Sequence, residues 1–243
     1  MSDDIGDRMK SYENVTRNYL TRRIPMIIRI DGKAFHTFAR GFMKPFDYVL
    51  MQSMWETTQY LCKNVEGCKI GYTQSDEISL LITDYMDIKT QSWFDKNIQK
   101  MVSVSASMAT LAFNNSFRKS EMPWHEKSID KALFDSRCFV IPKEEVCNYF
   151  IWRQQDATRN AIQMVGQANF SQKQLHGKNC SQIQEMLFSD KSINFNDLPV
   201  CEKRGVCIVK EEFTKYNAIR TRWVVDEGIP IFTQDRSYIE KYL

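Results

Sequence analysis

The sequence is poor in the residue patterns on which hydrolysis and disulfide scaffolds depend. It has only 3 histidines, and none lies close in the sequence to another histidine or to a G-x-S-x-G motif. Its 7 cysteines form neither a C-x-x-C pair nor a cysteine–histidine spacing typical of zinc. Zinc hydrolysis and serine-triad chemistry are therefore disfavoured, and we expect reduced, mostly buried thiols.

Long apolar runs and linkers are also absent. No apolar stretch approaches the roughly twenty residues that span a bilayer, and the acidic N-terminus, Met1–Asp4, has no apolar segment behind it. The 9 glycines and 6 prolines are scattered, without a repeat or a Ser/Gly-rich linker. We therefore expect a soluble, cytoplasmic protein without membrane contact. It should form one domain, with a core over about residues 24–142 and a C-terminal extension of helices and strands over about 143–243.

Charge of one sign is not in large excess. The net charge of +3 comes from 33 basic and 30 acidic side chains, so any affinity for nucleic acid has to come from local patches. Solvated surface is the more common role for any single basic cluster, although each cluster could bind phosphates. The clusters are Arg22-Arg23, Arg118-Lys119, Lys203-Arg204, and Arg220 with Arg222.

The apolar pattern predicts an α+β fold. Short β-branched segments alternate with helical periodicities, in the order strand, helix, strand, strand, helix, strand. That order is the split βαβ pattern of ferredoxin-like antiparallel sheets with helices on one face, which polymerase palms and nucleotide cyclases share. The predicted elements are a strand over Met26–Ile30, a helix over Lys44–Cys62 with Pro45 in its first turn, a hairpin of Lys69–Thr73 and Ile78–Thr83, a helix containing Met101, Val104, Met108, Leu111 and Ala112, and a strand over Arg137–Ile141.

Beyond Pro142 a long helix is predicted to reach about Ala168. Arg153 and Asn160 fall inside or at the border of its apolar stripe, where polar groups need partners. Either Arg153 pairs with Asp156 three residues on, or the stripe lines a polar cleft. The stripe itself consists of Val146, Phe150, Ala157, Met164 and Ala168.

Acidic residues at two places in the sequence suggest a metal site. Asp31 ends the first strand, and Asp76-Glu77 lies at the tip of the hairpin. Neighbouring strands of a split βαβ sheet would bring these carboxylates together, and hard oxygen ligands of this kind hold Mg²⁺. Two such ions stabilise the attacking and leaving oxygens of phosphoryl transfer. Taken alone, however, aspartates in such places more often form turns and caps.

Several segments, in the same order, resemble the tRNA-His guanylyltransferase family. The similarity extends from about Ile24 to Val209. The segments are Arg29-Ile30-Asp31-Gly32-Lys33-Ala34-Phe35-His36, Lys44-Pro45, Tyr72-Thr73-Gln74-Ser75-Asp76-Glu77, Leu111-Ala112-Phe113-Asn114, Trp152-Arg153-Gln154 with Asp156 and Asn160, Ile193-Asn194-Phe195-Asn196, and Lys203-Arg204-Gly205.

The resemblance implies a polymerase-like palm that works in the reverse, 3′-to-5′ direction. ATP would adenylylate a tRNA 5′-monophosphate, and the 3′-hydroxyl of an incoming nucleoside triphosphate would then attack it and release AMP. The implied partners are tRNA and nucleoside triphosphates, including ATP and GTP. Two Mg²⁺ ions and a homotetrameric assembly are implied as well.

The resemblance also assigns roles to individual residues. Asp31 and Asp76 would bridge the metal ions with the Gly32 carbonyl as a further ligand, and Glu77 is a weaker catalytic candidate. The nucleotide-binding residues would be Arg29, Lys33, Ala34, Phe35, His36, Lys44 and Ser75. For Arg29, a strand residue, a structural ion pair is an equal alternative, and for His36 packing or hydrogen bonding is the commoner role. Residues that bind RNA or line the cleft would be Arg153, Asn160, Lys203 and Arg204.

Two departures from the family pattern narrow the expected function. Thr158-Arg159-Asn160-Ala161 stands where eukaryotic members carry His-Ile-Asn-Asn, and Ile183 stands where a lysine is typical. The first feature resembles bacterial and archaeal relatives, which implies template-dependent repair of 5′-truncated tRNAs. The second implies that one contact to phosphate or RNA is absent. Addition of a single guanosine to tRNA-His, a palm-type nucleotide cyclase and a non-catalytic RNA-binding protein are the alternatives.

Overall fold

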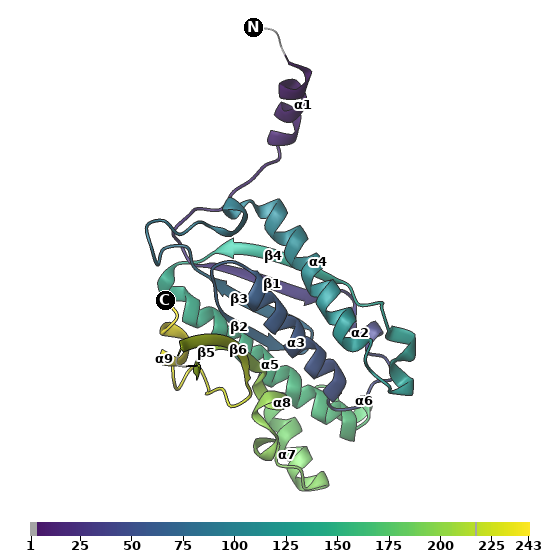
Figure 1. Cartoon of the computed structure of the whole chain (residues 1–243). Coiled ribbons are helices and arrows are strands. Elements are labelled where there is room, and N and C mark those ends of the chain that lie inside the picture. The colour runs from purple at the N-terminus through teal and green to yellow at the C-terminus, as the bar shows by residue number, and fades with distance from the viewer. Residues whose placement is uncertain (1–3, 217) are drawn as a thin grey trace.

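The computed structural model describes residues 4–216 and 218–243, which build one six-stranded antiparallel sheet with helices on both faces (Figure 1). The strands lie in the order β4-β1-β3-β2-β5-β6. The predicted α+β class with an antiparallel sheet is confirmed, and the C-terminal part adds two strands to it. The bounds are β1 Met26–Gly32, β2 Cys68–Gln74, β3 Glu77–Ile82, β4 Phe134–Val140, β5 Val206–Lys215 and β6 Ala218–Asp226.

Each face of the sheet has its own core. Helices α3 (Tyr48–Asn64) and α4 (Ile98–Phe117) cover one face, and α5 (Val146–Asn169) covers the other. The predicted covering of one face is corrected, because α5 packs on the face opposite α3 and α4. Alternate residues of β1 point to opposite faces, so Ile28 packs with the α3/α4 core and Ile27 with the α5 core. Burial on both faces explains why this strand is apolar from Met26 to Ile28 and again at Ile30.

Helix α3 begins later than the sequence pattern predicts. Asp47 is its N-cap, because its Oδ1 accepts a hydrogen bond of 3.1 Å from the Leu50 amide. Pro45 therefore precedes the helix instead of occupying its first turn, which corrects the predicted start at Lys44. Aspartate is a common N-cap residue, but the apolar spacing, which begins with Phe46, indicates an earlier start.

The buried face of α4 is rotated from the predicted one. Met101, Ser105, Ala109 and Phe113 are buried, whereas Leu111 is 56% exposed. The small side chains allow close approach to the sheet, since the hydroxyl oxygens of Ser105 and Ser136 on β4 lie 2.7 Å apart.

Helix α5 has the predicted length, but its stripe holds only in the first half. Ala157 is buried, whereas Met164 and Ala168 are exposed. Beyond Ala157 the buried side shifts to Ala161 and Val165, which pack in a third core with Ile183 and Leu187 of α7 (Cys180–Lys191).

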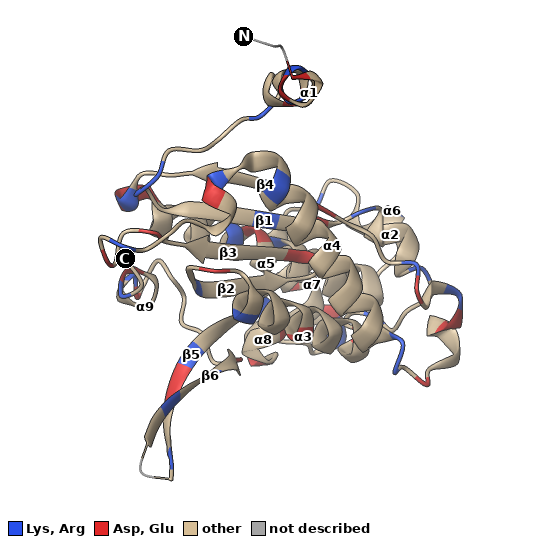
Figure 2. Ribbon diagram, turned by 45° about the horizontal axis from the view of Figure 1, so that its top comes forward, with Lys and Arg blue, Asp and Glu red and all other residues tan. Residues whose placement is uncertain are grey.

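The remaining elements are short or peripheral. Helix α1 (Ile5–Asn14) buries none of its residues and projects from the body, and the far end of the β5–β6 hairpin also leaves the sheet (Figures 1 and 2). Among the described residues no helix combines the length and apolar character of a bilayer span. All seven cysteines are free, and four of them are buried. The short helices are α2 Phe35–Phe38, α6 Gln172–Leu175, α8 Val200–Arg204 and α9 Ser237–Glu240, with 3₁₀ turns at Trp93–Lys96, Pro123–Ser128, Lys143–Glu145 and Phe195–Asp197.

Candidate active site

The predicted acidic residues meet at one end of the sheet. Asp31, near the end of β1, lies opposite Glu77 of β3. The Gly32 amide donates a 3.1 Å hydrogen bond to the Asp76 carbonyl in the β2–β3 turn. The antiparallel pairing of β1 with β3 therefore places Asp31 beside the hairpin tip, as the sequence pattern predicts.

The hairpin tip holds Asp76 in a desolvated position. Gln74 and Glu77 form the last pair of the ladder, leaving Ser75 and Asp76 as the turn. The Ser75 hydroxyl donates a 2.9 Å hydrogen bond to Asp76 Oδ1. Burial raises the pKa of Asp76, and the nearby charge of Asp31 adds to the rise, while the Ser75 hydroxyl opposes it. Ionisation of Asp76 is therefore more costly than that of an aspartate in water, and a bound cation would offset this cost.

Glu77 differs from the two aspartates because its carboxylate already has cationic partners. Arg153 donates to it twice, from Nε to Oε1 at 2.7 Å and from Nη2 to Oε2 at 2.9 Å. Arg29 Nη2 donates to Oε2 at 2.6 Å. Burial raises the pKa of Glu77, and the two guanidinium groups partly offset this rise. The geometry makes Glu77 an anchor for two arginines instead of a free metal ligand.

Two alternatives were predicted for Arg153: a pair with Asp156, or a place on a stripe that lines a polar cleft. It does pair with Asp156, at 2.6 Å. However, it is only 3% exposed and its bidentate partner is Glu77, so it is not a surface pair. Its guanidinium also lies 4.1 Å from the ring centre of the exposed Trp152. The polar residue in the apolar stripe thus ties α5 to the start of β3.

The acidic pair suits a hard divalent cation that keeps other ligands. Among the described residues, no three His, Cys, Asp or Glu side chains gather to form a metal cluster. The carboxylates of Asp31 and Asp76 and the carbonyl of Gly32 supply only part of a coordination shell. Mg²⁺ is typically bound in this way, by one or two carboxylates together with water and substrate phosphates. Arg29 Nη2 lies 3.7 Å from Asp31 Oδ2, a loose contact that a cation can replace.

The segment after Asp31 combines packing and exposed groups. Phe35 is buried, and its ring lies so close to Gly32 that a Cβ there would be 2.3 Å from it. Ala34 has a left-handed φ of 54°, and Lys33, Ala34 and His36 are exposed. Phe35 is therefore a packing residue that explains the need for glycine at position 32, while its neighbours face solvent beside the acidic pair.

A small pocket of about 80 Å³ adjoins the hairpin tip. Ser75 and Asn160 both line it, so the structure brings these two predicted residues together. Most of its remaining wall is apolar. Ala157 and Met164 belong to the stripe that was predicted, as one alternative, to line a cleft, but the residues of α3 and the segment before it were not assigned from the sequence, because their pattern is that of an ordinary core helix. The wall residues include Phe46, Leu50, Met51, Ala157 and Met164, with Asp47 at the edge.

Other predicted residues lie in separate pockets. Lys44 lines a pocket of about 460 Å³ together with His176, which directly follows α6. Lys203 and Arg204 line one of about 320 Å³, where the Lys203 ammonium donates to the Asn196 carbonyl at 2.5 Å. The cations Arg118 and Arg222 are paired with Asp130 and Glu211, as solvated surface charges often are.

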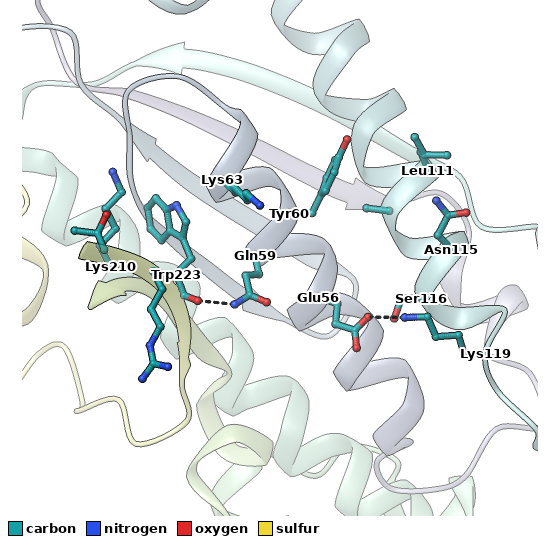
Figure 3. A pocket seen from close by; sticks show the side chains of 13 residues that line it. Glu56, Gln59, Tyr60, Lys63, Leu111, Asn115, Ser116, Lys119, Lys210 and Trp223 are labelled. Atoms are coloured by element: carbon teal, nitrogen blue, oxygen red, sulfur yellow. Dashed lines mark hydrogen bonds and ion pairs between the residues drawn. The ribbon is translucent and has the colours of Figure 1, made fainter. Parts of the chain in front are cut away.

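A larger pocket of about 1020 Å³ lies between α3, α4 and the β5–β6 hairpin (Figure 3). Gln59 Nε2 donates to the Trp223 carbonyl at 2.6 Å, which fixes the hairpin to α3. None of the predicted metal or nucleotide ligands lines it. Size alone therefore does not locate the chemistry.

Asp47 holds in place the start of α3 and the segment before it, which form one wall of the small pocket beside the hairpin tip. Its Oδ2 accepts hydrogen bonds from the Met43 amide at 3.1 Å and from Nε2 of the fully buried His125 at 2.8 Å. Burial tends to raise the pKa of Asp47, but the hydrogen bonds from His125, Leu50 and Met43 outweigh it, so the pKa lies below its ordinary value.

Replacing Asp47 with alanine is expected to lower the free energy of unfolding by about 2–4 kcal/mol, because a helix cap is lost and a buried His125 nitrogen is left unpaired. Urea unfolding measures this. Since the pKa of Asp47 is depressed in the folded state, its ionised form stabilises the protein above about pH 4, and this contribution disappears as the pH falls further. The alanine variant should show a smaller loss over that acidic range; equal losses would contradict the assignment.

Comparisons with known proteins agree in pointing to one family. The family described as tRNA-His guanylyltransferase matches residues 6–142. A solved structure of a bacterial tRNA(His) guanylyltransferase-like protein in complex with ATP is 52% identical, with a TM-score of 0.90 and 98% of each chain covered. Another in complex with GTP is 50% identical, with a TM-score of 0.84 and 99% of each chain covered. A probable human tRNA(His) guanylyltransferase is 30% identical over 78% of this chain and 67% of its own.

Proposed function

Because this chain belongs to the tRNA-His guanylyltransferase family and is therefore a nucleotidyltransferase that acts on tRNA, we propose that it repairs 5′-truncated tRNAs by template-dependent 3′-to-5′ addition of nucleotides. The observation that carries the proposal is the pairing of Asp31 with the hairpin tip, where a desolvated Asp76 adjoins the Ser75 hydroxyl and a small pocket.

The proposed reaction has two transfers. In the first, an oxygen of the RNA 5′-phosphate attacks the α-phosphorus of ATP, and pyrophosphate leaves. In the second, the 3′-hydroxyl of a nucleoside triphosphate loses its proton and attacks the 5′-phosphorus of the adenylylated RNA, and AMP leaves. The RNA is then one nucleotide longer and carries a 5′-triphosphate. ATP and GTP complexes of the similar bacterial proteins support nucleoside triphosphates as substrates.

We assign the metal ligands to Asp31, Asp76 and the Gly32 carbonyl, on a palm-like sheet end. Two bound Mg²⁺ ions would neutralise the triphosphate and the developing charge on the attacking and leaving oxygens. Glu77 positions Arg29 and Arg153 beside this site, where Arg29 can reach a substrate phosphate. The Ser75 hydroxyl, which donates to Asp76 in the free protein, would turn to a phosphate oxygen when the metal ions occupy Asp76, and the apolar pocket wall beside it suits a flat base.

The positions that depart from the family pattern support repair over addition of one fixed guanosine. Ala161 is buried in the third core, and Arg159 is paired with Asp156. Ile183 is likewise buried, against Gly166. The Thr158 hydroxyl is bonded to the Gln154 carbonyl, which leaves the exposed Arg159 as the one charged side chain among these positions. A single charge does not read a particular base, so pairing with the opposite RNA strand would select the nucleotide.

The test is to incubate the protein with Mg²⁺, the four nucleoside triphosphates and tRNAs that lack their first nucleotide. We expect template-matched extension of tRNA-His and of another tRNA alike, and none with Asp76→Ala. No extension of any tRNA by the wild-type protein would refute the activity. A preference for untemplated guanosine on tRNA-His alone would refute repair in favour of the single-addition alternative.

A further inference from the structure

A polar pocket of about 750 Å³ lies at the end of the sheet away from the acidic pair. It is formed by the segment that leads from α1 into β1 and by residues 88–100 before and at the start of α4. Asp31 is five residues beyond the start of β1, and a strand rises about 3.3 Å per residue, which separates the two sites by about 17 Å along the strand. This pocket is therefore separate from the proposed active site.

Cations predominate in this pocket. Its five basic side chains face three acidic ones, Glu66, Asp84 and Asp95. Two of these acids are already neutralised, because Asp84 pairs with the buried Lys96 at 3.2 Å and Asp95 pairs with Arg22. Figure 2 shows basic residues along the segment between α1 and β1. The basic residues are Arg17, Arg22, Arg23, Lys89 and Lys100.

Exposed aromatic rings lie among these cations. Phe94 is 38% exposed and Tyr19 is 50% exposed, although both line the pocket. The Lys100 ammonium lies 6.0 Å from the Phe94 ring centre. Positive charge that tracks a phosphate backbone, together with rings on which bases stack, is the combination by which proteins bind unpaired nucleic acid.

The wall that carries Phe94 is held in an unusual backbone. Phe94, Asp95 and Lys96 have consecutive left-handed φ values of 47°, 56° and 58°. The Lys96 ammonium donates to the Thr21 and Ile24 carbonyls, both at 2.9 Å, and so ties this loop to the basic segment. The two chain segments thus form a pre-shaped wall that presents an aromatic ring to solvent.

We propose that this pocket binds unpaired nucleotides of the RNA substrate, by stacking on Phe94 and Tyr19 and by phosphate contacts to Arg23 and Lys89. The assignment rests on the proposed action on tRNA, and it adds a second RNA contact at the opposite end of the sheet. The unpaired segment is either the 3′ overhang next to the repaired 5′ end or a loop elsewhere in the tRNA.

Direct binding tests this assignment without requiring turnover. Fluorescence anisotropy would follow a single-stranded RNA oligonucleotide and a 5′-truncated tRNA with the wild-type protein, with Arg23→Gln/Lys89→Gln and with Phe94→Leu. Because each single-strand phosphate contact contributes about 0.7 to the salt slope, the double variant should reduce the slope of log affinity against log salt by about 1.4. Loss of one stacking ring should weaken binding by about tenfold.

Lys127→Gln/Lys178→Gln is the matched control, since both lysines are exposed and lie outside this pocket. It should keep the wild-type salt slope. Wild-type binding by both pocket variants, or equal weakening by the control, would overturn the assignment. So would a pocket variant that changes the oligomeric state in analytical ultracentrifugation without RNA, because the surface would then be a contact between copies.

The source of the nucleotides is distinguished by two further RNAs. If Phe94→Leu no longer weakens binding of a tRNA trimmed of its 3′ overhang, the overhang is the bound segment. If Phe94→Leu no longer weakens binding of an acceptor-stem minihelix that lacks the other loops, the bound segment is a loop. If the wild-type protein extends no tRNA yet binds single-stranded RNA through this pocket, the proposed reaction fails and the RNA site stands.

Discussion

Replacing Asp76 with asparagine is expected to abolish nucleotide addition and to stabilise the metal-free protein. Loss of a metal-binding carboxylate removes several kcal/mol of charge stabilisation in the transition state, which corresponds to a fall in kcat of at least about a thousandfold. Burial and Asp31 raise the pKa of Asp76, so its ionised form opposes folding. The neutral amide should therefore raise the melting temperature by about 2–4 °C for each kcal/mol of relieved repulsion.

The pH dependence of stability follows from the direction in which the pKa of Asp76 is shifted. Because the folded-state pKa of Asp76 lies above its ordinary value, the wild-type protein without metal should lose stability as the pH rises through that pKa, and the asparagine variant should not. Added Mg²⁺ should stabilise the wild-type protein more than the variant, since only the wild type keeps both carboxylates.

Calorimetry with and without Mg²⁺, together with single-turnover extension of a truncated tRNA, measures both effects. Asp135→Asn is a matched control, because Asp135 pairs in register with Asp31 but is exposed and bonded to Arg137 at 3.1 Å. The Asp135→Asn protein should retain activity, and Mg²⁺ should stabilise it as much as it stabilises the wild type. A destabilised but active Asp76→Asn protein would contradict the metal assignment.

The first four strands of the sheet were predictable because their segments are short, rich in apolar residues and separated by clear turns, whereas β5 and β6 were expected only as part of a C-terminal extension. Met26–Gly32 and the β2–β3 hairpin lie where the pattern places them. Helix faces were harder to predict: α4 buries Ser105 and presents Leu111 to solvent. Small side chains are needed where a helix approaches a sheet closely, and hydrophobicity alone cannot indicate that requirement.

The acidic pair was predictable in position, but the electrostatic roles around it were not. Asp31, Asp76 and Glu77 look alike in the sequence, and only the fold places two arginines on Glu77 and leaves Asp76 with a hydroxyl. Arg153 lies 76 residues from its partner Glu77 in the chain, so no local pattern could identify that pair. The pocket with Phe94 likewise depends on a contact between distant segments, one before β1 and one before α4.

Removing one partner of the Arg153–Glu77 pair is expected to destabilise the protein more than breaking any other single interaction at the site. Replacing Arg153 with methionine leaves a buried carboxylate with Arg29 as its remaining cationic partner, and breaking a buried pair in this way costs about 3–5 kcal/mol. Urea unfolding should show that loss. Adding Glu77→Leu to Arg153→Met should recover much of it, because the uncompensated charge is then removed.

Activity should follow a different course from stability in these variants. The start of β3 adjoins Asp76, and Arg29 is held by Glu77, so the double variant should remain slow even where it is folded. Its defect should appear mainly in kcat, since Glu77 and Arg153 position Arg29 and the turn. A control, Arg159→Gln, removes the exposed partner of Asp156 and should change neither property. Full activity in the double variant would show that these residues serve the fold alone.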